Sequence, residues 1–189
     1  MNLKKVIFDI EKNNKPLFEK VFRSEVNEAS LRTLSEMSLN SYLIAITPRS
    51  GSSYFIDLLR NTKLLGEPAE YLNPGLIPNI AKAVGANNFS DYWLKLVNRP
   101  NCKDIHGVKA SYFQFLPIIE TGLDEVLFNN TKIILLKRKN IVQQAVSLYF
   151  ATQTEIFHTN ISHSDEKWNQ LEKLNYSNDK IMHWVKHIY

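Results

Sequence analysis

Seven residues from Thr47 to Ser53, with the sequence TPRSGSS, combine a cation, several hydroxyls and a glycine in one short segment. They follow the apolar run 42–46 and precede a stretch at 54–60 whose spacing predicts a helix. A strand, a tight turn and a helix in this order present the N–H groups of the helix start to an anion. Arg49 adds a permanent charge with several donors, and the hydroxyls can also donate. The segment therefore predicts a phosphate or sulfate site.

The same segment lacks the lysine of a Walker A loop. Such a loop has two glycines separated by four residues, and it ends with Gly-Lys followed by Ser or Thr. Here Ser52 follows Gly51, and the cation at Arg49 precedes the glycine. We therefore do not expect an ATPase or a GTPase. Taken alone, the segment is also compatible with a serine-rich turn that merely begins a helix.

A second segment, from Arg138 to Ser147 (RKNIVQQAVS), also joins the end of an expected strand to the start of an expected helix. The strand, 132–137, is a short apolar run rich in β-branched residues, which is typical of a buried parallel strand. Ligands collect at the carboxyl edge of such strands, which is where we expect Arg138. In isolation, a solvated basic corner with a surface serine is the simpler interpretation of this segment.

Strand and helix patterns alternate along the chain and would position both segments. Alternation of this kind indicates an α/β fold with a parallel central sheet that has helices on both faces. Three strands are few for such a sheet, so we expect that it lacks an edge strand on the C-terminal side. We expect strands at 42–47, 105–110 and 132–137, and helices at 52–61, 77–84, 91–97 with Ser90 as N-cap, 140–154, 165–174 and 177–188.

The first 40 residues have a separate pattern. Between Pro16 and Ser38 the apolar residues recur at roughly helical spacing. We therefore predict a helical extension over residues 1–40 and one main domain over residues 41–189. A chain of 189 residues is long enough for a sizeable core.

Composition limits the classes of partner and compartment. The net charge of +4 suits anionic ligands, but no basic block interleaved with aromatic residues indicates nucleic acid. Cys102 is the only cysteine, so we expect no intrachain disulfide and a cytoplasmic location. The apolar runs are too short to cross a membrane. No secretory signal is visible in the charged N-terminal residues.

Four motifs occur together in a definite order: TPRSGSS, GEPAEYL, HGVKASYF and RKNIVQQAVSLYFATQT. Over residues 41–154 this arrangement resembles the Stf0-type sulfotransferases, the family of bacterial trehalose 2-sulfotransferase. The resemblance implies a P-loop-like three-layer α/β sandwich. It also implies that the donor substrate is 3′-phosphoadenosine 5′-phosphosulfate (PAPS). The acceptor would be a hydroxyl of a carbohydrate or glycolipid.

The resemblance also assigns roles to individual residues. Arg138 and Ser147 match the pair that holds the 3′-phosphate of the donor. Glu70 matches the carboxylate proposed as the catalytic base of the family, and Lys109 matches a lysine that would assist the leaving group or the donor's sulfate. The first loop would bind the 5′-phosphosulfate end with Pro48, Arg49, Ser50, Gly51, Ser52 and Ser53.

The expected chemistry suits these residue types. A carboxylate can take the proton of the attacking hydroxyl, and N–H groups with a guanidinium can stabilise charge on the leaving oxygen. The transferred sulfuryl group carries less negative charge than a phosphoryl group, so we expect no metal. Three alternatives stay open: Glu67 as the base in place of Glu70, Lys109 as an ordinary strand-terminal lysine, and a relative that binds the sulfonucleotide without catalysis. A homodimer is compatible with the sequence.

Overall fold

The computed structural model describes residues 28–99, 105–120, 124–157, 169, 173–174 and 177–188. The chain divides into two units, and each is described below by itself. The first unit comprises residues 1–46 and 53–135. The second comprises residues 47–52 and 136–189.

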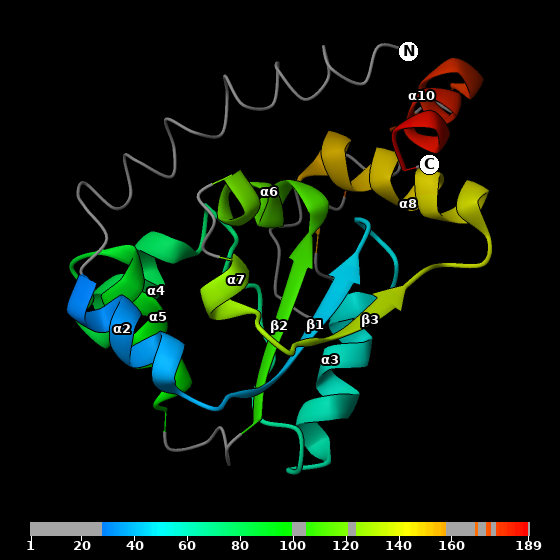
Figure 1. Ribbon diagram of the computed structural model, residues 1–189. Coiled ribbons are helices and arrows are strands. Elements are labelled where there is room, and N and C mark those ends of the chain that lie inside the picture. The colour runs from blue at the N-terminus through cyan, green and yellow to red at the C-terminus, as the bar shows by residue number, and fades with distance from the viewer. Residues whose placement is uncertain are drawn as a thin grey trace. The chain divides into compact units, whose positions relative to one another are not determined.

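A small parallel sheet forms the centre of the first unit (Figure 1). Its strands are β1 (Asn40–Ile46), β2 (Ile105–Ser111) and β3 (Lys132–Leu136), in the order β2-β1-β3. The parallel register of β1 and β2 runs from Asn40 opposite Ile105 to Ile46 opposite Ser111. The mixed α/β class and the parallel sheet that the sequence predicts are therefore confirmed.

Strand β3 differs from its predicted environment. The apolar run at 132–137 predicts a strand buried on both faces, but β3 lies at an edge of the sheet. Ile133 and Leu135 are 70% and 61% exposed. The prediction of a buried strand was wrong, because an apolar run indicates a strand but does not fix how many layers cover it.

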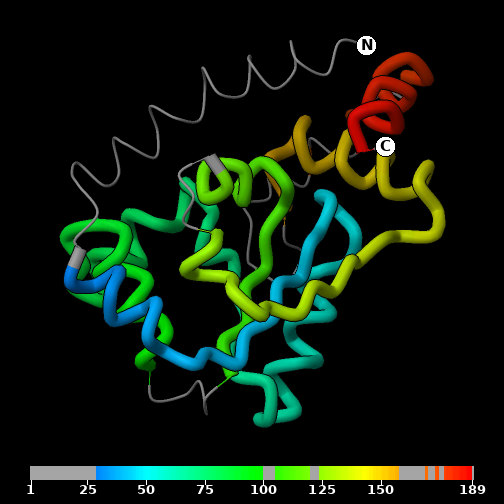
Figure 2. Tube along the Cα trace, viewed as in Figure 1, coloured from blue at the N-terminus to red at the C-terminus, as the bar shows by residue number. Residues whose placement is uncertain are grey.

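Most helices of the first unit gather around one aromatic core. Figure 2 follows the chain from α2 directly into β1, and Figure 1 shows α2, α4 and α5 together on one side of β2. Tyr92, Trp93 and Leu96 of α5 are fully buried in this core, and Leu34 anchors α2 against it. The helices are α2 (Glu28–Glu36), α3 (Ser52–Asn61), α4 (Ile77–Val84), α5 (Phe89–Val97), α6 (Tyr112–Glu120) and α7 (Asp124–Leu127).

The start of α5 corrects one predicted cap. Asn88 is the N-cap, and its side chain accepts a hydrogen bond from the Asp91 N–H over 2.9 Å. Ser90 lies inside the first turn and donates to Asn88 Oδ1 over 2.8 Å. Both residue types favour N-caps, so the sequence alone does not select between two of them at neighbouring positions.

Within the described residues, the second unit contains the loop Thr47–Ser52 and the helices α8 (Ile141–Thr154) and α10 (Asn178–Ile188). Asn140 caps α8 by accepting a hydrogen bond from the Gln143 N–H over 3.0 Å. The two helices pack through Ala145, Tyr149 and Ile181.

Some sequence predictions fall outside the described residues. The first part of the N-terminal helix, 16–27, and most of the predicted helix 165–174 lie there, as does Cys102. Within the described ranges, none of the helices has both the length and the apolar character needed to span a bilayer.

Candidate functional site

The loop between β1 and α3 has an uncommon backbone conformation. Arg49 and Gly51 have positive φ angles of 63° and 90°. Glycine adopts such angles readily, but arginine does so only where its surroundings hold it. The Ser50 N–H donates to the Thr47 carbonyl over 3.2 Å and closes the turn. A Cβ atom added at Gly51 would meet no other atom within 4 Å, so the turn faces open space there.

Ser50 is the buried hydroxyl of this turn. Its exposed fraction is 8%, and its Oγ has no hydrogen-bond partner within the residues that the structure describes. A buried hydroxyl without a partner is costly, so this hydroxyl is available as a hydrogen-bond donor.

Gln144, on α8, holds the loop Thr47–Ser52 in place. Its side chain is 2% exposed, and its Nε2 donates to Thr47 Oγ1 over 2.8 Å and to the Pro48 carbonyl over 2.7 Å. One buried amide on α8 therefore holds the first two residues of the loop. Sequence reasoning assigned no role to Gln144, although its position on the buried face of α8, four residues before Leu148, could have indicated one.

Arg49 is held by the same helix. Its Nε donates to Ser147 Oγ over 2.9 Å, and its NH1 group donates to the Phe157 carbonyl. These two bonds join the loop to the middle of α8 and to the segment that follows it. They help to hold Arg49 in its positive-φ conformation, because the Nε and NH1 groups of its side chain are both tethered.

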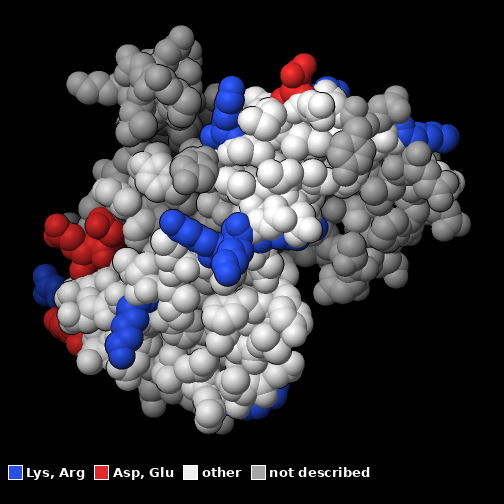
Figure 3. Space-filling view, turned by 90° about the vertical axis from the view of Figure 1, so that its right-hand side faces the viewer, with Lys and Arg blue, Asp and Glu red and all other residues white. Residues whose placement is uncertain are grey.

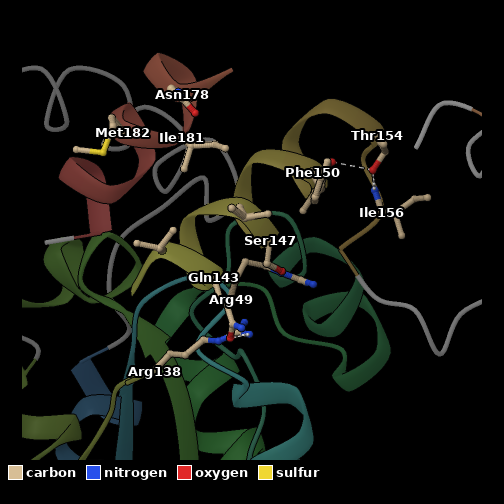
Figure 4. Close-up of a pocket in the computed structure, with 13 residues that line it drawn as sticks. Arg49, Arg138, Gln143, Ser147, Phe150, Thr154, Ile156, Asn178, Ile181 and Met182 are labelled. Carbon is tan, nitrogen blue, oxygen red and sulfur yellow. Dashed lines mark hydrogen bonds between the residues drawn. The ribbon is translucent and has the colours of Figure 1, made fainter. Parts of the chain in front are cut away.

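Arg49, Arg138 and Ser147 line one cavity of about 880 Å³. Figure 4 shows Arg49 and Arg138 close together at one end, beside Gln143. Arg138 donates to Gln143 Oε1 over 3.3 Å. Burial, and after it the charge of Arg138, lowers the pKa of Arg49 below its ordinary value. The two guanidinium groups therefore repel each other across this end of the cavity.

No carboxylate balances these two cations. Within the described ranges, neither Arg49 nor Arg138 has an Asp or Glu within ion-pair distance, and none lines the cavity. In the space-filling view, Lys and Arg side chains are visible near the middle of one face (Figure 3). Paired cations without a counter-charge are an arrangement suited to phosphate or sulfate.

A second group of predicted residues lies in the first unit. Glu70 and Lys109 form an ion pair, with Lys109 Nζ 2.5 Å from Glu70 Oε1. Lys109 is on β2 and is only 5% exposed. The sequence predicts a role for both residues but not that they bind each other.

The carboxylate of Glu70 accepts further hydrogen bonds on its other oxygen. Asn73 Nδ2 donates to Oε2 over 2.6 Å, and Gln114 Nε2 donates to the same atom over 3.3 Å. Burial alone would raise the pKa of Glu70, but the hydrogen bond and charge of Lys109, aided by Asn73 and Gln114, lower it below its ordinary value. Glu70 is therefore ionised at neutral pH.

The chain before Glu70 lies along β2. Ala69 forms a parallel bridge with Val108, and the Lys109 N–H donates to the Ala69 carbonyl over 2.9 Å. This pairing needs Gly107, because a Cβ there would overlap the ring of Tyr42 and come within 2.9 Å of Pro68 Cβ. The motifs GEPAEYL and HGVKASYF are thus joined by backbone pairing and by the ion pair between Glu70 and Lys109.

The predicted site residues consequently form two groups. The loop 47–52, Arg138 and Ser147 belong to the second unit, whereas Ser53, Glu70 and Lys109 belong to the first. Glu67, the alternative base, has an exposed side chain, in contrast to Glu70.

The described residues contain no group of three His, Cys, Asp or Glu side chains that could hold a metal ion. Comparisons of the chain with protein-family models, with curated proteins and with solved structures found no match.

Proposed function

We propose that this protein is a sulfotransferase of the Stf0 type. It transfers the sulfuryl group of PAPS to a hydroxyl of a carbohydrate or glycolipid. The observation that carries the proposal is the convergence of Arg49, Arg138 and the Ser147 hydroxyl on one cavity that no described carboxylate lines. Two anionic groups of one nucleotide would meet the charges and the donors of this region.

The donor would be held at both of its anionic ends. Its 3′-phosphate binds Arg138 and Ser147, which distinguishes it from AMP and ATP. Its 5′-phosphosulfate binds the turn from Ser50 to Ser53, where Ser50 offers a buried donor and Gly51 leaves space. Arg49 lies in the same loop and reaches Ser147, so it is suited to hold the two ends at a fixed separation.

The reaction would be a direct transfer. The acceptor oxygen attacks sulfur, and the bond between sulfur and the 5′-phosphate oxygen breaks. Glu70 takes the proton of the acceptor hydroxyl. The leaving adenosine 3′,5′-bisphosphate carries the new negative charge on its 5′-phosphate, which the N–H groups of the turn and Arg49 stabilise. The lowered pKa of Glu70 keeps it in the form that accepts a proton.

The same proposal includes the detailed fold type, the cellular compartment and the oligomeric state. A P-loop-like three-layer sandwich is supported by the parallel sheet and by the turn between β1 and α3. A main domain over residues 41–189, a reducing cytoplasm and a homodimer belong to the proposal as expectations.

One observation favours a second candidate, a relative that binds the sulfonucleotide without turnover. Both oxygens of Glu70 are already occupied, by Lys109 on one side and by Asn73 and Gln114 on the other. A carboxylate held in this way can serve as a fixed structural anion. For catalysis, the acceptor hydroxyl would have to replace one of these donors.

Binding of nucleotides to the 189-residue chain tests the proposed nucleotide site. We expect adenosine 3′,5′-bisphosphate to bind at least about tenfold more tightly than AMP, because a charged hydrogen bond contributes about 1.5–3 kcal/mol. Arg138→Ala should remove that preference by weakening only the bisphosphate. Lys139→Ala, a neighbouring cation outside the cavity lining, is the matched control. Equal binding of the two nucleotides to the unaltered chain would contradict the proposal.

Transfer of labelled sulfate from PAPS to a panel of sugars and glycolipids separates the two candidates. An enzyme with Glu70 as base loses at least about a hundredfold in rate in Glu70→Gln, with nucleotide binding preserved. If Glu67→Gln loses activity instead, Glu67 is the base. Tight nucleotide binding without transfer to any acceptor of the panel would favour the non-catalytic relative.

A further inference from the structure

The cavity of about 880 Å³ between α8 and α10 is larger and more apolar than a phosphate site requires. Arg49 and Arg138 occupy only one end of it (Figure 4). Beyond them the described part of the wall is mainly apolar, with Val146 and Phe150 on α8 and Ile181 on α10. Volumes of 300–1,000 Å³ are typical of pockets that enclose small molecules.

The apolar wall on α8 has a regular spacing. Val142, Val146 and Phe150 follow one another at intervals of four residues, so they lie along one face of the helix. Met182 on α10 lines the same cavity. Val142 and Met182 are 54% and 50% exposed, so part of this wall faces water. Apolar surface of this kind gains about 25 cal/mol per Å² when a ligand covers it.

The polar groups deep in the cavity are already engaged. Thr154 Oγ1 donates to the Phe150 carbonyl over 2.8 Å and accepts from the Ile156 N–H over 3.2 Å. Among the described residues of the α10 wall, this leaves the Asn178 amide, at the end remote from Arg138, as the polar side chain (Figure 4). A planar base would bring several polar edges to this wall, whereas an aliphatic chain brings none. A methionine side chain, such as that of Met182, also adapts well to a flexible chain.

We propose that this cavity binds an amphiphilic anion, a phosphate or sulfate monoester of an aliphatic alcohol. The anion lies between Arg49 and Arg138, where it relieves their mutual repulsion, and accepts a hydrogen bond from Ser147. The chain extends along Val146 and Phe150 toward α10.

This inference goes beyond the proposed function and does not depend on it. Where both hold, they are linked, because the amphiphile and the 3′-phosphate of the nucleotide need Arg138 and Ser147 at the same time. An aliphatic monoester would then compete with adenosine 3′,5′-bisphosphate. Nucleotide binding by itself says nothing about the apolar wall, so the two ideas can fail separately.

Calorimetry with the complete chain and four monomeric probes tests the proposal: inorganic phosphate, butyl phosphate, octyl phosphate and phenyl phosphate. The three esters offer the same anionic head, so differences among them report on the wall, and inorganic phosphate shows what an anion binds without a chain. We expect octyl phosphate to bind at least about tenfold more tightly than butyl phosphate, because each buried methylene contributes up to about 0.8 kcal/mol. Inorganic phosphate should bind most weakly.

Polar substitutions that leave the net charge unchanged test whether the apolar wall contributes to binding. Val142→Asn and Met182→Asn should each reduce the affinity for octyl phosphate about fivefold or more and leave that for inorganic phosphate within about twofold. Both sites are half exposed, so the fold should tolerate the changes. Gln153→Asn, on an exposed position of α8 outside this cavity, is the matched control.

Three results would overturn the proposal. Equal affinities for butyl and octyl phosphate would show that the wall contributes nothing. Tighter binding of phenyl phosphate than of octyl phosphate would assign the cavity to an aromatic group. Binding to vesicles that contain an anionic phospholipid, without binding of monomeric octyl phosphate, would assign the cations to a membrane surface. Binding of octyl phosphate without any binding of adenosine 3′,5′-bisphosphate would support this proposal and contradict the proposed function.

Discussion

Arg49 donates through its Nε to Ser147 Oγ over 2.9 Å, which joins two residues 98 positions apart in the chain. Arg49 belongs to the loop between β1 and α3, and Ser147 belongs to α8. A ligand anion that binds either residue therefore changes the surroundings of the other. Residues 47–52 and 138–147, which the sequence suggests as two candidate anion sites, both belong to the second unit.

Gln144→Met should destabilise the protein by about 1–3 kcal/mol. Methionine preserves the shape of the side chain, but Thr47 Oγ1 and the Pro48 carbonyl lose their buried donor. Chemical denaturation at pH 7 measures the change. Gln153→Met, on the exposed side of the same helix, should change stability by less than about 0.5 kcal/mol. Equal effects of the two substitutions would show that the Gln144 bonds contribute little.

Local sequence patterns predict the helices better than they predict how the sheet is covered. The bounds predicted for α3 and α4, 52–61 and 77–84, agree with the structure, because spacing of apolar residues and nearby glycines are local signals. The burial of β3 is not local. It depends on which segments cover the sheet, and an apolar strand sequence carries no information about that.

The chemistry of the site is likewise only partly visible in the sequence. Residue types and loop order indicate Arg49 as a candidate, and the family resemblance is what adds Arg138 and Glu70. The bond between Glu70 and Lys109 and the role of Gln144 are contacts between distant segments. Several polar partners were available in each case, and only packing selects among them.

Lys109→Met should cost about 3 kcal/mol at pH 7, because it leaves the carboxylate of Glu70 largely buried without its counter-charge. The double variant Lys109→Met with Glu70→Gln should recover most of that loss. The pKa of Glu70 is lowered in the folded protein, so the ion pair stabilises above the ordinary value of 4.5 and this contribution is lost as the pH falls below it. Urea denaturation at pH 7 and pH 4 therefore should show a smaller difference between wild type and Lys109→Met at the lower pH.

A penalty for Lys109→Met that is independent of pH would contradict this account. Such a result would mean that the substitution acts through packing and not through the charge of Glu70.

Gly107→Ala should destabilise the protein by about 1–3 kcal/mol, because the added methyl group overlaps the Tyr42 ring and approaches Pro68. The Tyr42 hydroxyl donates to the Leu65 carbonyl over 2.8 Å, so the ring cannot move without breaking that bond. Thermal denaturation measures the effect. At Gly75 a Cβ would approach only Asn73 Oδ1, at 3.4 Å, so Gly75→Ala is the control. A Gly107→Ala protein as stable as this control would show that the first unit relaxes around the methyl group.

His106 should make stability depend on pH between about 6.5 and 4. The imidazole is 4% exposed, stacked on Tyr71 with ring centroids 5.6 Å apart and edge-on to Trp93. Burial, followed by the charge of Arg99, lowers its pKa from 6.5 to about 4. Between these two pH values, the His106 imidazole therefore binds a proton in the unfolded chain but not in the folded protein.

Stability from this source is complete above pH 6.5 and falls as the pH decreases toward 4, by a total of about 3 kcal/mol. His106→Met places an apolar side chain of similar size in the core and removes the titratable group. Urea denaturation at pH 7, 6 and 5 should thus give a shallower slope of stability against pH for His106→Met than for wild type. His183→Met, which removes an exposed histidine, is the control. An unchanged slope in His106→Met would mean that another group accounts for the pH dependence in this range.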